Sequence, residues 1–211
     1  MVLKFHLTKK IIMKKILLAV IILVGLSTTL SAQAKFGLKG GISIANAKMV
    51  SGNVTTTYNS IVSPQFGVTV DFKGSDKFNV QSGLLYNGFG GKSSESSETN
   101  TITIGALSVP VLAKFQLGSG FYGYAGPQIS FVLSAKDKWA YGSTSGEEDM
   151  KDQVKSTLFH GVLGLGYKIQ DHFGVFGEYQ AGLSNVDNST ENSGNTKINV
   201  HALTFGLSYT F

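Results

Sequence analysis

From residue 35 to the end of the chain, apolar and polar residues alternate with a period of two. The clearest example is the last segment, in which small or polar residues separate Leu203, Phe205, Leu207, Tyr209 and Phe211. Such alternation is typical of β-strands whose two faces meet different surroundings, because successive side chains point to opposite sides. No run of 18 apolar residues follows Ala34, which excludes a membrane-spanning helix there. The pattern predicts an all-β fold.

Eight such runs are separated by connections that alternate in length. The expected strands cover residues 35–45, 61–73, 77–89, 101–117, 121–135, 155–170, 173–184 and 197–211. Long polar connections cover 46–60, 90–100, 136–154 and 185–196, and short turns lie at 74–76, 118–120 and 171–172. Strict alternation of long and short connections is the plan of an up-and-down antiparallel barrel.

A soluble eight-stranded barrel, such as a lipocalin, would show the same alternation, so composition has to decide. Charged residues make up 15% of the chain, against about 25% in typical soluble proteins. The polar face is mainly Gly, Ser, Thr, Gln and Asn, which suits the interior of a narrow membrane barrel. Aromatic residues gather toward strand ends, as they do at membrane interfaces: Phe66, Phe72, Phe78, Phe173, Phe205, Tyr209 and Phe211. Composition therefore favours a membrane barrel.

Two runs depart from regular alternation. Ile198 and Val200 are out of step with the residues from Leu203 onward. This break, at 201–202, indicates either a β-bulge or a strand that has already left the bilayer. The run at 121–135 has mixed phase, and its two faces stay unassigned.

Residues 1–34 have the pattern of a secretory signal peptide. Lys14 and Lys15 precede an apolar run over 16–26, and an A-x-A site ends at Ala34, where we place cleavage. The alternative, an inner-membrane anchor, needs about 20 apolar residues, and this run stops after 11. Because Met13 begins a complete signal by itself, residues 1–12 need not belong to the natural start. We expect a signal peptide over 1–34 and a barrel domain over 35–211.

The formal net charge of +5 does not indicate a nucleic-acid binder. It comes from five lysines in the first 34 residues, and from residue 35 onward lysines and acidic residues balance. The chain has no arginine, the residue that nucleic-acid interfaces favour. It also has no cysteine, which excludes a disulfide scaffold, an iron–sulfur site, a thiol nucleophile and a lipoprotein anchor.

Five motifs in chain order resemble one known family. They are KFGLKGG at 35–41, LSVPVLAKF at 107–115, YAGP at 124–127, GLG at 164–166 and GLSYTF at 206–211. Together they resemble the outer-membrane β-barrel domain of PorT-like, porin-family proteins of Bacteroidota, over essentially all of 35–211. The resemblance implies an eight-stranded antiparallel up-and-down transmembrane β-barrel like OmpA and OmpX, preceded by a cleavable helical signal peptide. It implies no particular activity, and the link of the family's name-giving member to protein secretion is not carried over.

The resemblance also implies a location and partners. We expect a monomer in the outer membrane of a Gram-negative bacterium, in contact with outer-membrane lipid and with its long loops outside. These loops would reach extracellular or envelope protein partners, and we expect no nucleic-acid partner. General resemblance among outer-membrane proteins makes Leu207, Tyr209 and Phe211 a C-terminal insertion signal for the barrel-assembly machinery.

The inward-facing polar positions form the one candidate site, and they are Lys39, Lys114, Lys168, Glu178 and Gln180. Charges in a narrow lumen must pair, because little water is left to solvate them. We expect Glu178 to pair with Lys168 or Lys114, in a network that serves packing. An ion or substrate path is the alternative.

Neither catalysis nor metal binding is indicated. His160 and Ser156 share a run, but a hydrolase also needs an orienting acid. The acidic cluster at 147–152 lacks EF-hand spacing, so a solvated loop is favoured over a calcium site. We expect no catalytic residue, metal or cofactor. The expected function is a structural or surface-interaction role with a side-chain-filled lumen; the alternatives are a narrow pore for small solutes or ions and a lipid-modifying enzyme.

Overall fold

The computed structural model describes residues 34–95, 98–188 and 196–211. Residues 1–33, which hold nearly all of the expected signal peptide, lie outside these ranges. The long strands are β1 (Ala34–Ser51), β3 (Ile61–Lys73), β4 (Phe78–Glu95), β5 (Glu98–Gly118), β6 (Phe121–Tyr141), β8 (Thr157–Lys168), β9 (Phe173–Gly182) and β10 (Thr196–Thr210). Shorter elements are β2 (Val54–Thr57), β7 (Thr144–Asp149) and the 3₁₀ turn η1 (Lys151–Gln153). No helix among the described residues has the length and apolar character to cross a membrane.

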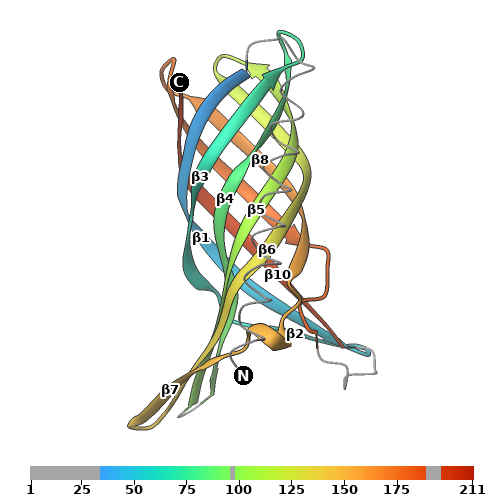
Figure 1. Cartoon of the computed structure of the whole chain (residues 1–211), viewed down its shortest axis with the longest axis vertical. Coiled ribbons are helices and arrows are strands. Elements are labelled where there is room, and N and C mark those ends of the chain that lie inside the picture. Colours follow the sequence, from blue (N-terminus) through green and yellow to red (C-terminus); the bar gives the residue numbers. More distant parts are fainter. Residues whose placement is uncertain (1–33, 96–97, 189–195) are drawn as a thin grey trace, which may run out of the picture. The chain divides into compact units, whose positions relative to one another are not determined.

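The eight long strands form a closed antiparallel ring in chain order (Figure 1). The last strand pairs with the first, from Gly37 opposite Thr210 to Ser51 opposite Thr196, without a register break. Tight turns at 74–77, 119–120 and 169–172 join strands at one end, here called the short-turn end; the other is the hairpin end. The predicted up-and-down eight-stranded barrel is confirmed.

The long connections contain more strand than the sequence predicts. β4 and β5 remain paired out to Glu95 opposite Glu98, and the end of β6 pairs with β7. Residues 92–95, 98–103, 136–141 and 144–149 thus form a four-stranded sheet, here called the extension sheet. It projects beyond the barrel beside the β7 label in Figure 1. The polarity of 90–100 and 136–154 predicts connections there, but strand pairing continues into both of these segments.

The outer face of the barrel is an exposed apolar surface. Leu163, Leu165 and Leu207 are each more than 60% exposed, although they belong to a well-ordered sheet. Monomeric soluble proteins rarely expose contiguous apolar patches of this extent, whereas a lipid-facing surface requires them. Aromatic pairs on adjacent strands, in tilted or edge-on contact, surround the short-turn end as an interface belt: Phe78 with Phe115, Phe121 with Tyr167, and Phe173 with Tyr209.

The two irregular runs have different causes. In β10 there is no bulge: Val200, Ala202 and Thr204 all point inward and are buried, so the face changes from polar to apolar without changing phase. In β6 a bulge does occur, because Ser134 and Val132 pair with consecutive residues of β5 and leave Leu133 unpaired. This extra residue shifts the inward phase and explains the mixed pattern at 121–135.

The lumen is therefore divided into two halves of different chemistry. Toward the short-turn end it holds the buried lysines, glutamine and glutamate described below. Toward the hairpin end it holds an apolar core, whose buried members include Phe89, Ile104, Val132, Leu158 and Val200. The expectation that the polar face of the strands lines the interior therefore holds for the short-turn half, whereas the hairpin half is lined by apolar side chains.

Candidate functional site

A buried ion pair forms the centre of the polar lumen. The ammonium of Lys39 on β1 contacts the carboxylate of Glu178 on β9, and both side chains are at most 5% exposed. Three further donors bind the same carboxylate: Gln65 Nε2 at 2.7 Å, Gln180 Nε2 at 2.9 Å and the Tyr124 hydroxyl at 2.9 Å. Such full hydrogen bonding is what makes a buried charge tolerable.

Aromatic rings hold the lysine of this pair in place. The Lys39 ammonium lies 4.2 Å from the centre of the Phe176 ring and 5.0 Å from that of Tyr124. Cations are attracted to ring faces, more strongly where water is excluded. The Tyr124 ring fits because Gly164 on the neighbouring strand β8 has no side chain: a Cβ at Gly164 would lie 2.3 Å from the Tyr124 ring.

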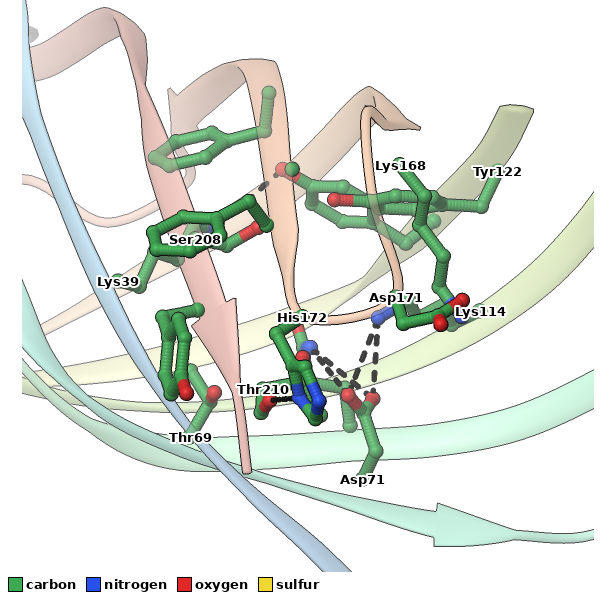
Figure 2. Close-up of a pocket in the computed structure, with 16 residues that line it drawn as sticks. Lys39, Thr69, Asp71, Lys114, Tyr122, Lys168, Asp171, His172, Ser208 and Thr210 are labelled. Atoms are coloured by element: carbon green, nitrogen blue, oxygen red, sulfur yellow. Dashed lines mark hydrogen bonds and ion pairs between the residues drawn. The ribbon is translucent and has the colours of Figure 1, made fainter. Parts of the chain in front are cut away.

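A second ion pair lies closer to the short-turn end (Figure 2). Lys114 Nζ is 3.2 Å from an oxygen of Asp71, and Gln81 Nε2 donates to the same carboxylate at 3.1 Å. The pocket here has a volume of about 30 Å³, which is roughly the share of one water molecule in liquid water. Lys168 lines this pocket but is exposed.

Side-chain amides and hydroxyls continue the network toward the hairpin end. Gln128 Nε2 donates to Gln180 Oε1 at 3.1 Å, and Ser130 Oγ lies 3.2 Å from His160 Nδ1. Ser108 and Ser130 share a hydrogen bond of 2.8 Å. All five side chains are at most 2% exposed, so the lumen is filled at this level rather than open.

The structure places the predicted lumen residues as follows. Lys39, Lys114, Glu178 and Gln180 are buried in the lumen, whereas Lys168 lies at its mouth. The expected pairing of Glu178 with Lys168 or Lys114 is wrong, since Glu178 binds Lys39 and Lys114 binds Asp71. Lys168 and Glu178 do lie on adjacent strands, but they are opposite Gly174 and Gly164 respectively and therefore far apart along them.

Sequence reasoning did not single out Gln65, Asp71 and Tyr124 as members of the network. Gln65 and Asp71 occupy odd-numbered positions of the 61–73 run, which are the polar, inward-facing ones, and this pattern could have identified them. Tyr124 carried no such signal, because a tyrosine is as common on a lipid-facing surface as in a packed lumen.

The residues considered for catalysis and metal binding have other partners. His160 stacks on Phe89 at 4.5 Å, and its Nε2 has no hydrogen-bond partner among the described residues. An orienting carboxylate for a Ser–His pair is thus missing from the described ring. The described residues contain no group of three or more His, Cys, Asp or Glu arranged for a metal.

The acidic cluster instead joins the surface of the extension sheet. Glu147 contacts Lys136 and lies 3.3 Å from Lys138, and hydrogen bonds from these lysines lower the pKa of its carboxyl. A groove of about 370 Å³ runs beside these residues, with Trp139, 42% exposed, among its lining. The Trp139 ring packs flat against Gly146 of β7, where a Cβ would lie 2.5 Å from it.

The C-terminal residues lie in the aromatic belt of the short-turn end. Tyr209 packs edge-on against Phe173 at 4.9 Å and against Phe211 at 5.1 Å. Leu207 faces outward and is 63% exposed. Their role as an insertion signal stays a prediction.

Comparison with known proteins agrees with this architecture. The family model described as "Outer membrane protein beta-barrel domain" matches residues 29–188. Among solved structures, neisserial surface protein A has a TM-score of 0.52 at 14% identity, over 85% of this chain and 99% of that one. Ail, the attachment invasion locus protein of Yersinia pestis, has a TM-score of 0.47 at 13% identity, over 83% and 98%. No curated protein matches the sequence.

Proposed function

This chain belongs to the outer membrane protein beta-barrel domain family, and we propose that it is a closed barrel that presents the extension sheet as a contact surface outside the cell. In this proposal it resides in the outer membrane of a Gram-negative bacterium, after export by the N-terminal signal peptide. It inserts as a monomer into outer-membrane lipid with the help of the barrel-assembly machinery.

The filled lumen supports the closed barrel. Lys39 and Glu178 bind each other inside it, and the buried side chains of Gln128 and Gln180 fill the lumen next to them. Eight strands leave an interior just wide enough for side chains, and the pocket at the short-turn end has room for about one water. A narrow pore for small solutes would need this network to open.

Planar-bilayer recording tests the closed barrel directly. Pure refolded protein is expected to give no steady conductance, and the variant Glu178→Gln serves as a comparison in which the ion pair is broken. Steady ion conductance from the unaltered protein would overturn the closed-barrel proposal.

The extension sheet supports the contact role. It carries the exposed aromatic side chains Trp139 and Tyr141, which are 42% and 60% exposed, beside an open groove. Tryptophan and tyrosine are enriched among the residues that dominate protein-binding energy. Among the described residues, β7 pairs only with β6, so its outer edge offers backbone groups for a partner strand.

The orientation can be tested because the chain has no cysteine. Ser145→Cys on β7 is expected to react with a membrane-impermeant maleimide in intact cells. Ser119→Cys, in a tight turn of the opposite end, is expected to react only after permeabilisation. The reverse labelling pattern would place the extension sheet on the periplasmic side and contradict the proposal.

The contact surface can be tested by panning a displayed peptide library on folded barrels in nanodiscs. Peptides that use the groove are expected to lose binding to the Trp139→Ala variant. They should keep binding to Val54→Ala, which removes an exposed side chain from β2 instead. Selected peptides that bind all three barrels equally would refute a role for the groove.

A further inference from the structure

The hairpin end of the lumen contains a cavity of about 270 Å³ that the function proposed above does not use. Its walls are inward-facing positions of the strands and of two connecting segments. The apolar side chains that matter for the argument are Ile102, Ile104, Val154, Val186, Ile198 and Val200. Tyr58, Gln153 and Asp187 add the polar part of the lining.

A folded segment covers the cavity at its outer side. Residues 150–154, with η1, lie over the barrel mouth, and three contacts hold them there. Met150 N donates to Ala135 O at 2.9 Å, Lys151 Nζ donates to Leu133 O at 2.7 Å, and Val154 pairs with Asp187 in an isolated bridge. The Leu133 carbonyl belongs to the β6 bulge. The cover is therefore a built part of the fold.

The barrel wall separates the cavity from the bilayer at the seam where the chain closes. β1 and β10 are paired without interruption past the cavity, as far as Ser51 opposite Thr196. A lipid chain therefore has no gap to enter through this seam.

The chemistry of the lining selects the occupant. Water needs two to four polar partners in a cavity, and apart from Tyr58, Gln153 and Asp187 the side chains of this lining are apolar. An engineered apolar cavity of about 150 Å³ binds benzene, and this one is larger. We propose that the cavity binds a small uncharged apolar molecule, such as a one-ring or two-ring hydrocarbon, taken up from the aqueous side. In this proposal the polar network that fills the short-turn half of the lumen stops the bound molecule from crossing the barrel.

The test is a methyl NMR titration of the folded barrel in nanodiscs with p-xylene as the probe. Saturable shifts are expected at the cavity methyl groups of Ile102, Ile104 and Ile198. The outward methyl groups of Ile42 and Ile44, which are 62% and 46% exposed, report partition into lipid. Shifts confined to these outward groups, or shifts everywhere without saturation, would overturn the proposal, as would no shift at all.

Variants make the assignment specific. Ala47→Trp fills the cavity and should abolish the saturable shifts, whereas Ala125→Trp makes the same change on the outer face and should keep them. Should Ala47→Trp fail to fold, Val200→Thr keeps the side-chain shape and is expected to weaken binding by placing a hydroxyl in the lining. Saturable shifts that persist in folded Ala47→Trp, or an unchanged affinity for p-xylene in Val200→Thr, would overturn the assignment. Nuclear Overhauser contacts from lipid chains to the cavity methyl groups before p-xylene is added would overturn it as well.

Discussion

Replacing Glu178 with glutamine is expected to lower the free energy of unfolding by about 3–5 kcal/mol, because it leaves a buried lysine without its counter-charge. Lys39 is 6% exposed, so water cannot replace the lost carboxylate. In the unaltered protein Gln65, Gln180 and Tyr124 all donate to the carboxylate, and the glutamine of the variant keeps only one acceptor oxygen for them. The lower end of the range already corresponds to more than a hundredfold in the unfolding equilibrium constant.

The double variant Lys39→Met/Glu178→Gln separates the charge pairing from the hydrogen bonds. Removing both charges leaves no ion unpaired, so the double variant should be less destabilised than the two single variants added together. Residues in one ion-pair network typically show interaction energies of about 0.5–3 kcal/mol. The assay is equilibrium urea unfolding in lipid vesicles, followed by the difference in gel mobility between folded and unfolded barrels.

A matched control uses the exposed pair Lys73 and Asp76, whose nitrogen–oxygen distance is 3.0 Å. Asp76→Asn likewise replaces a carboxylate by its amide, at a position that water reaches, and surface pairs contribute only about 0–1 kcal/mol. If Glu178→Gln cost no more than this control, or if the double variant cost the sum of the singles, the reasoning from the buried pair would be refuted.

Two further predictions concern other parts of the barrel. Gly164→Ala should lower the unfolding free energy by about 1–3 kcal/mol, because its methyl group would press on the Tyr124 ring and draw the hydroxyl away from Glu178. Gly40→Ala is the control in the same urea titration, because nothing lies within 4 Å of a Cβ there. Equal effects of the two substitutions would contradict the packing argument. The lysine partners of Glu147 lower the pKa of its carboxyl, so the pairing stabilises the β7 hairpin above the ordinary carboxyl pKa and is lost as the pH falls through the lowered value. The protection factors of the β7 amides, which are the intrinsic exchange rate divided by the observed one, should therefore fall on acidification, and the same fall in Glu147→Gln would argue against it.

Much of the barrel could be predicted from alternation and turn residues. The run at 61–73 coincides with β3, and the three tight turns lie where glycine, serine and aspartate interrupt the pattern. The extension sheet could not be predicted in this way, because both of its faces meet water and no apolar face marks the strands. The apolar half of the lumen was also hidden: Ile198 and Val200 looked like a break in phase, when the inward face itself changes composition.

The partner of Glu178 could not be predicted for a geometric reason. Tilt and stagger let residues of strands that are not direct neighbours meet inside a barrel. Adjacent strands suggested Lys168, yet Glu178 binds Lys39 of β1, a strand separated from β9 by β10, and Lys168 lies at the mouth. Alternation along one strand identifies which residues point into the lumen. Which of these residues touch one another depends on the stagger of all eight strands.

Because of the bulge at Leu133, even-numbered residues of β6 point inward before it, and odd-numbered residues point the same way after it. Deleting this single residue would exchange the two faces of 134–141 and turn Trp139 to the other side of the sheet. The same deletion would remove the carbonyl that holds Lys151 over the cavity. This one inserted residue therefore separates the face pattern of the extension sheet from that of the barrel wall. The groove beside Trp139 and the segment that covers the cavity both depend on it.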